Sequence, residues 1–311
     1  MSNTNYDVSK IDHFLETLKQ INPVYSKQIR RTAQSNLSSF EQLANPMLAW
    51  AESVLGSSWA STLSHGYIAF VSEVNKSQLD YEESGHYKYS SFAEVEKITY
   101  GSADFMKLYH WGVYVTTFAW NHHLHLNDFF FNQFLPLLQR SRTGSIVDFG
   151  AGSGIWTALA LSNLSGWEAK AVDISPTSVE WAKSLMKAAR LNHRVDVQQG
   201  NALVFQPPEP VQAGISCFVL EHLEHPDILL SNICQSISPG SPAFVCSALT
   251  AAEVDHIYEF RRESELIQMA EDCGFRIRAT LSVAPDSIPL NRRFIPRSMA
   301  MVLERRHGEW W

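Results

Sequence analysis

Three glycines stand at alternate positions, Gly150, Gly152 and Gly154, directly after an apolar segment that ends in an aspartate, in the stretch SIVDFGAGSGIWT. An apolar strand, a glycine-rich turn and a helix together make a cradle in which a nucleotide-like ligand lies close to the backbone. The dinucleotide fingerprint needs another glycine where this chain has Ile155, followed by Trp156. A bulky pair there suits a ligand with a sulfonium-bearing amino acid better than one with a pyrophosphate.

A carboxylate follows at the end of the next apolar segment. Asp173, in AVDIS, comes 19 residues after Gly154. A carboxylate at this place can accept hydrogen bonds from both hydroxyls of a ribose, which is a general need of adenosine binding. The glycine loop and Asp173 together therefore predict a ligand that contains adenosine.

Histidines form a second group with chemical potential, in NHHLHLND. His122, His125 and Asp128 follow one another at steps of three, so a helix would place them on one side. One reading is a metal site of imidazole and carboxylate ligands. Another is a helix whose histidines face solvent or fill an interface between domains. We expect no metal.

The bulk composition limits the classes of partner. The chain has 311 residues, of which 45% are hydrophobic and 18% charged, and its formal net charge is −7. An acidic chain argues against a nucleic-acid partner, because phosphate contacts need clustered Lys and Arg. No apolar run approaches the roughly 18–20 residues of a membrane span. We expect neither nucleic acid nor membrane as a partner, and we leave a homodimer open.

The ends of the chain and its cysteines indicate a compartment. The N-terminus lacks the basic-then-apolar order of a signal peptide. The four cysteines, Cys217, Cys234, Cys246 and Cys273, form no C-x-x-C pair, which is typical of reduced thiols in a cytosolic protein. We therefore expect a cytoplasmic protein.

The elements that must position these residues divide the chain in two. Residues 8–75 read as amphipathic helices, residues 77–92 as a polar loop, and residues 100–134 as aromatic-rich helices. From residue 144 onward, short apolar strands alternate with helices, which is typical of a parallel sheet covered on both faces. We place a helical domain at 1–140 and an α/β domain at 141–311.

The order of motifs resembles that of class I S-adenosylmethionine (SAM)-dependent methyltransferases. VDFGAGSG is similar to their first motif, and AVDIS, GNAL and SISPGSPAFV follow in the family's order. CFVLEHLEHPDILL resembles a segment of the ubiquinone-methyltransferase-like group. The resemblance covers about residues 130–305. It implies a Rossmann-like sheet of seven strands, mostly parallel with the last antiparallel, under an N-terminal helical lid that binds substrate.

The resemblance also implies SAM as cofactor, and Asn201 resembles the residue that reads the adenine amine. The cofactor-binding residues that we expect are Asp148, Gly150, Ala151, Gly152, Gly154, Asp173, Ile174, Asn201, Ala202, Leu220 and Glu221.

Methyl transfer needs chiefly an acceptor held in line with the methyl group and protected from water. A general base helps only an acceptor that must lose a proton. The candidates for such a base are His123, His122 and His222, and the residues expected to contact the acceptor are Tyr109, Trp120, His122 and His123.

The function expected from the sequence is methylation of a small aromatic or lipophilic metabolite on oxygen, nitrogen or carbon, as in small-molecule biosynthesis. Two alternatives stay open. One is a SAM-binding regulatory or scaffold protein without catalysis, and the other is a methyltransferase that acts on a protein or peptide. A filled pocket would favour the first alternative, and an open groove the second.

Overall fold

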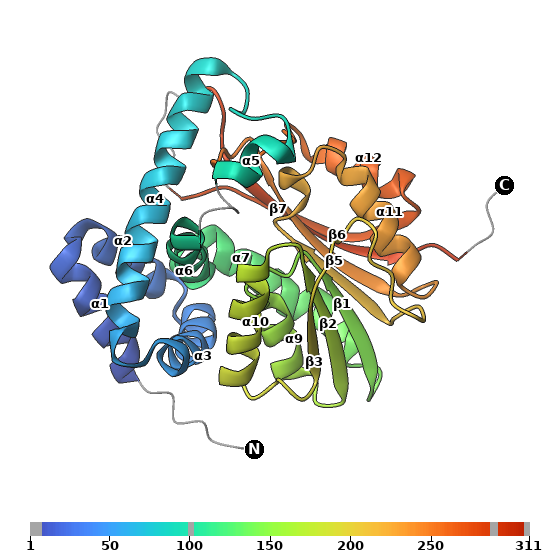
Figure 1. Ribbon diagram of the computed structural model, residues 1–311, viewed down its shortest axis with the longest axis horizontal. Helices are drawn as coiled ribbons and strands as arrows, with labels where there is room; N and C mark the ends of the chain where they lie inside the picture. The colour runs from blue at the N-terminus through green and yellow to red at the C-terminus, as the bar shows by residue number, and fades with distance from the viewer. Residues whose placement is uncertain (1–7, 99–102, 287–291, 308–311) are drawn as a thin grey trace.

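A computed structural model of the protein describes residues 8–98, 103–286 and 292–307 (Figure 1). Seven strands form one sheet in the order β3-β2-β1-β4-β5-β7-β6. Every neighbouring pair is parallel except the two that involve β7, which runs antiparallel to β5 and to β6. The predicted sheet is therefore confirmed. Its strands are β1 (Gly144–Phe149), β2 (Trp167–Asp173), β3 (Val195–Gln199), β4 (Ala213–Cys217), β5 (Pro242–Leu249), β6 (Phe275–Val283) and β7 (Arg297–Arg305).

Helices precede the sheet and cover it. In Figure 1 the first four gather on one side, with α6 and α7 between them and the sheet, while α11 and α12 lie on the other side. The helices before the sheet are α1 (Val8–Ile21), α2 (Pro23–Ser35), α3 (Leu37–Leu55), η1 (Gly56–Ser58), α4 (Trp59–Ser84), α5 (Phe92–Ile98), α6 (Ala103–Ala119), α7 (Asn121–Phe129), η2 (Phe130–Phe134) and α8 (Leu135–Leu138). Those that follow are α9 (Ile155–Asn163), α10 (Pro176–Ala188), η3 (Leu220–His222), α11 (Pro226–Ser236) and α12 (Glu263–Asp272).

One hydrophobic core joins the helical part to the sheet. Buried side chains run continuously from Phe14 and Phe118 on the N-terminal helices to Phe130 on η2 and Phe244 on β5. Phe130 contacts Phe244 edge-on with ring centroids 4.8 Å apart. The chain passes from α8 to β1 close to residue 140. A division there separates an all-helical part from a part with strands and helices, and the two parts share one core.

The predicted loop over residues 77–92 is wrong in its first half. Helix α4 continues to Ser84 and ends at Gly85, which is left-handed (φ 79°) and donates its N–H to the Tyr81 carbonyl. The segment from Ser77 to Ser84 contains no glycine or proline that would end a helix. Its Gln78 and Tyr81 are buried against other parts of the protein, which explains polar residues in a helix.

The predicted aromatic helices are confirmed from Ala103 onward, whereas Tyr100 lies outside the described residues. The part of the chain that the structure describes has no helix both long enough and apolar enough to traverse a bilayer.

Candidate active site

A cavity of about 860 Å³ lies between the carboxyl ends of the strands and the N-terminal helices. Its sheet side consists of residues that follow the carboxyl ends of the strands, where open α/β sheets bind their ligands. Its helical side is formed by α2, α4, α6 and α7. The site residues expected from the sequence that line it are Gly150, Ala151, Gly152, Asp173, Ile174, Asn201, Ala202, Glu221, His222, Tyr109, Trp120, His122 and His123.

The three glycines of the loop have different reasons to be glycine. A Cβ on Gly150 would approach Val219 to 2.6 Å, and one on Gly154 would approach Met186 to 2.8 Å. A Cβ on Gly152 would meet no atom within 4 Å, and the backbone there is left-handed (φ +54°). The backbone is also left-handed at Gly150 (φ +72°) and Gly154 (φ +74°), where packing is a second reason for glycine, while Gly152 faces open space.

Asp173 closes this cradle at the end of β2. Its Oδ2 accepts a hydrogen bond from the Gly152 N–H at 2.8 Å, and its Oδ1 accepts one from the Ser175 N–H at 2.9 Å. Burial raises the pKa of Asp173, although the two backbone N–H groups counteract part of this effect. Each carboxylate oxygen has a second lone pair. The Ser178 hydroxyl also interacts with this carboxylate, and the lone pairs that the protein leaves open can accept from ribose hydroxyls.

The neighbouring wall offers an apolar surface and one amide. Ile174 is 45% exposed, an unusual state for a large aliphatic side chain next to a sheet. Asn201 follows β3, and its Oδ1 accepts a hydrogen bond from the Leu203 N–H at 2.9 Å. This hydrogen bond stabilises the turn that contains Asn201, and only the second lone pair of the oxygen is left for an adenine amine.

Three expected cofactor residues do not line the cavity. Asp148 is 2% exposed, and its carboxylate accepts a hydrogen bond from the Thr157 hydroxyl at 2.7 Å. Burial, helped by the charge of Asp173, raises the pKa of Asp148 to about 7. Gly154 packs on Met186, and Leu220 is buried in the core beneath β4 and β5. The structure therefore places these three residues outside the lining of the cavity, and their contact with the cofactor stays a prediction.

On the helical side, the two adjacent histidines differ in their neighbours. Both rings lie near Trp120, with centroids 5.2 Å away for His122 and 5.0 Å for His123, but His123 also lies 5.4 Å from Phe218. Phe218 follows β4 and has a left-handed backbone (φ 57°), a strained conformation of the kind that clusters at functional sites. His123 is thus the histidine of α7 that faces the end of the sheet.

Burial lowers the pKa of His122 to about 4 and that of His123 well below its usual range. Both rings are therefore neutral near pH 7 and would be weak bases.

The alternative of a metal site on α7 has no support. His122, His125 and Asp128 belong to no three-ligand group within the described part of the chain. Asp128 instead accepts a hydrogen bond from the Ser39 hydroxyl at 2.9 Å.

The sequence analysis missed a cluster of ionisable groups in the loop after β5. The Tyr109 hydroxyl donates to Glu253 at 2.7 Å, and His222 Nδ1 lies 3.5 Å from an Asp255 carboxylate oxygen. His256 completes the cluster, and Glu253, Asp255 and His256 all line the cavity. Their place just after a parallel strand was the available signal, because carboxyl ends of strands carry ligand sites.

The groups of this cluster influence one another. Burial, together with the charge of Asp255, raises the pKa of Glu253 to about 7. Burial alone lowers the pKa of His222, but the nearby Asp255 and Glu221 carboxylates outweigh it and hold that pKa above its usual value. Burial lowers the pKa of His256 to about 3, so this ring is neutral.

Comparison with known proteins identifies the family. Residues 120–280 match the family described as "Methyltransferase domain", and the chain therefore belongs to it. It is a methyltransferase of class I, a class that uses SAM. No curated protein matches the sequence.

Among solved structures, two are similar over most of this chain. An O-methyltransferase family protein from Burkholderia thailandensis is 12% identical with a TM-score of 0.52, covering 85% of this chain and 73% of its own. The mitomycin 7-O-methyltransferase MmcR is 16% identical with a TM-score of 0.49, covering 84% and 72%. Because the sequence identity is only 12%, the first of these structures supports the fold of this chain and says nothing of its substrate.

Proposed function

We propose that the protein transfers the methyl group of SAM to a small aromatic or lipophilic molecule held between the sheet and the N-terminal helices. One observation carries the proposal. The same cavity is lined by Gly152 and Asp173 on the sheet and by Tyr109, Trp120 and His123 on the helices. A cofactor on the sheet side and an acceptor on the helical side would therefore share one cavity.

The residues on the sheet side fit SAM. The open space at Gly152 accommodates a ligand close to the backbone, the free lone pairs of Asp173 suit two ribose hydroxyls, and exposed Ile174 offers an apolar surface to adenine. When bound, SAM supplies a methyl group on a positively charged sulfur. The protein's own task is to position the acceptor and to exclude water.

The helical side suits an apolar acceptor. Tyr67, Phe70 and Trp120 form an aromatic wall, in which the Trp120 indole N–H donates to the Tyr67 hydroxyl at 3.2 Å. Aromatic walls with a few polar groups are typical of small-molecule pockets. We assign to neutral His123 the role of positioning the acceptor next to Phe218.

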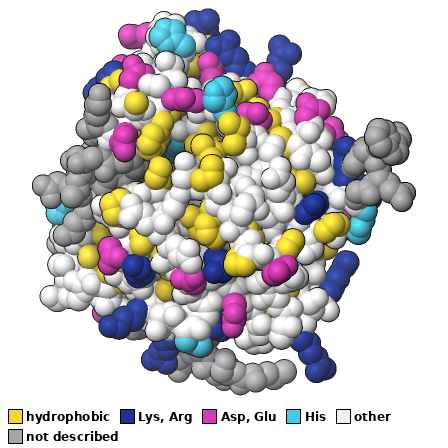
Figure 2. All heavy atoms as spheres, turned by 45° about the vertical axis from the view of Figure 1, so that its right-hand side comes forward, with side chains coloured by type: hydrophobic (Ala, Val, Ile, Leu, Met, Phe, Trp, Pro, Cys, Tyr) yellow, Lys and Arg dark blue, Asp and Glu magenta, His cyan; other side chains and the backbone are white. Residues whose placement is uncertain are grey.

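The cavity favours this reading over the alternatives. A volume of about 860 Å³ lies within the range of roughly 300–1,000 Å³ for small-molecule sites, whereas a scaffold protein without catalysis would need no acceptor space. On the face drawn in Figure 2, the described Lys and Arg side chains are scattered among Asp and Glu, unlike a nucleic-acid surface. All four cysteines are free, which supports the proposed cytoplasmic location.

The experiment is incubation of the protein with methyl-labelled SAM and a small-molecule extract of its source organism. We expect label in a low-mass product, whose structure identifies the methylated atom. The control is the Gly152→Val variant, which should give no product. Label in protein or RNA instead, or the absence of any labelled product, would overturn the proposal.

A further inference from the structure

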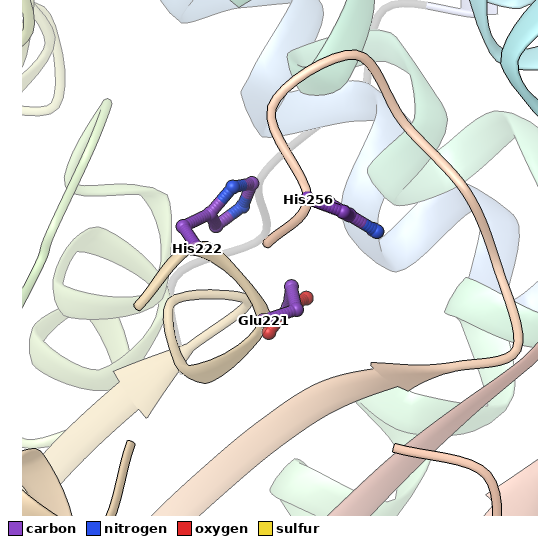
Figure 3. A group of neighbouring side chains, drawn as sticks. All are labelled: Glu221, His222 and His256. Carbon is purple, nitrogen blue, oxygen red and sulfur yellow. The ribbon is translucent and has the colours of Figure 1, made fainter. Parts of the chain in front are cut away.

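Three potential metal ligands meet where the segments after β4 and β5 line the cavity. Glu221, His222 and His256 each offer one ligand atom, and these atoms all lie within 4.8 Å of one another. Glu221 and His222 belong to η3 after β4, whereas His256 comes from the loop after β5, which faces η3 in Figure 3. The carboxyl ends of two adjacent strands thus bring together residues 34 positions apart in the chain.

Both imidazoles are oriented by backbone carbonyls. His256 Nδ1 lies 2.7 Å from the Ala251 carbonyl oxygen, and His222 Nδ1 lies 3.0 Å from that of Asp255. A carbonyl can only accept, so each Nδ1 carries hydrogen, and Nε2 is the atom of each ring whose lone pair can bind a metal once it carries no proton. Metal-binding histidines are held in the same way, by a carbonyl or carboxylate on the other ring nitrogen.

The unused nitrogen of His256 is the second sign of a ligand. The side chain is only 2% exposed, yet no hydrogen bond to its Nε2 is found in the described part of the chain. This atom is not one of the fully buried polar atoms without a partner in the described residues, so it is open to the cavity that His256 lines. A ligand that accepts an imidazole lone pair would satisfy it.

The carboxylate of the group is equally well held. Glu221 accepts hydrogen bonds from the Ser247 hydroxyl at 2.8 Å and from the Ala248 N–H at 3.1 Å, which leaves one lone pair on each oxygen. Neither Glu221 nor Glu253 is bonded to a Lys or Arg within the described residues. Buried carboxylates are normally paired or bound to a metal.

We propose that Glu221, His222 and His256 bind a divalent metal ion at the wall of the cavity formed by the segments after β4 and β5, close to Tyr109 of the helical side. Two nitrogen ligands and one oxygen ligand suit ions such as Zn²⁺, Mn²⁺ or Fe²⁺ better than Mg²⁺ or Ca²⁺. Asp255 then acts as an outer partner that orients His222. This role is an alternative to the base role considered for His222, and it departs from the expectation of no metal that was drawn from the sequence. An ion there would polarise an oxygen of the acceptor.

Metal binding does not depend on the proposed methyl transfer, so it is tested with the metal alone. The protein is stripped with a chelator, dialysed and titrated with Zn²⁺ and with Mn²⁺ by calorimetry. We expect one site per chain. His256→Ala should weaken binding by about 100-fold or more, since even changes to outer partners cost about 10–100-fold. His122→Ala, a buried cavity histidine outside the group, should bind normally.

Two further comparisons decide the ligand set. Glu221→Gln should lose more affinity than Glu253→Gln, because Glu253 belongs only to an alternative group with Asp255 and His256. In the wild-type protein, pulsed electron paramagnetic resonance of bound Mn²⁺ should show coupling to imidazole nitrogens. This measurement does not depend on whether the variants fold.

Absence of metal binding by the wild type, unchanged binding by His256→Ala, or Mn²⁺ with oxygen ligands only would overturn the proposal. Loss on Glu253→Gln with retention on Glu221→Gln would overturn the assignment of Glu221. SAM affinity, measured on the same His256→Ala protein, should be unchanged, which separates a failure of this proposal from a failure of the proposed function.

Discussion

At the scale of single residues, a substitution of Gly152 can test whether the glycine loop binds a ligand or is only a tight turn. A side chain there would project into open space in the protein alone but into the cofactor in the complex. Gly56 makes a matched comparison, because it is also left-handed (φ +62°) with nothing within 4 Å of a Cβ. Gly56 lies in η1, and it is not among the residues that line the cavity.

We expect Gly152→Val to abolish SAM binding and Gly56→Val to leave it intact, with similar small losses of stability from the strained backbone. Calorimetry with SAM and thermal unfolding check both variants. Normal SAM affinity in the folded Gly152→Val protein would mean that the loop is only a turn.

Asp148 predicts a pH dependence of stability. Because burial raises its pKa to about 7, the folded protein holds this proton more tightly than the unfolded chain, whose carboxyl titrates near about 3.9. Unfolding therefore releases a proton between these values, and this contribution to stability is present below about pH 4 and lost as pH rises through about 7.

Asp148→Asn removes that titration while keeping an acceptor oxygen for Thr157. Its free energy of unfolding should fall less between pH 4 and 7 than that of the wild type, by on the order of 2–4 kcal/mol. Denaturant unfolding at three pH values measures this. The exposed control Asp196→Asn should follow the wild type, and an equal pH slope for Asp148→Asn would contradict the account.

At the scale of elements, α7 is the helix that brings the acceptor residues to the sheet. Its His123 lines the cavity beside Phe218, while His125 on the same helix does not line it. His123→Gln should lower turnover by about 10–100-fold through misplacement of the acceptor, with the dissociation constant of SAM unchanged. His125→Gln should behave as the wild type. A variant of His123 that weakens SAM binding and spares turnover would place this residue on the cofactor side.

The end of α4 holds the loop that follows β5. Gln78 donates to the Thr250 carbonyl at 3.3 Å and accepts from the Ala252 N–H at 2.9 Å, both buried. The Tyr87 hydroxyl donates to the Ala251 carbonyl, which also accepts from His256. Helix α4 thus positions the ionisable cluster from a distance of more than 160 residues in the chain.

Gln78→Ala should lower the free energy of unfolding by about 1–3 kcal/mol, since it leaves two buried backbone groups unpaired. It should also lower turnover, because the loop that carries Glu253 and His256 loses its support. Gln268→Ala, an exposed glutamine on α12, is the control. Unchanged stability and turnover in Gln78→Ala would show that α4 does not support the loop.

At the scale of the whole molecule, local patterns predicted the sheet and its cradle. The alternation of strands and helices, the glycine loop and Asp173 are read from neighbouring residues, and the structure brings them together as expected. The ionisable cluster was missed because Tyr109 and Glu253 are 144 positions apart and no local spacing joins them. The helical end of α4 was missed for the same reason, since its polar residues bond to a distant loop.

The central claim is that one cavity holds the cofactor on its sheet side and the acceptor on its helical side. A crystal structure with S-adenosylhomocysteine, the product that SAM leaves after methyl transfer, tests it most directly. We predict the ribose hydroxyls on Asp173, the backbone of Gly152 against the amino-acid part, and the sulfur facing Phe218 and His123. Binding of the product anywhere else, or a sulfur that points away from α7, would contradict the account.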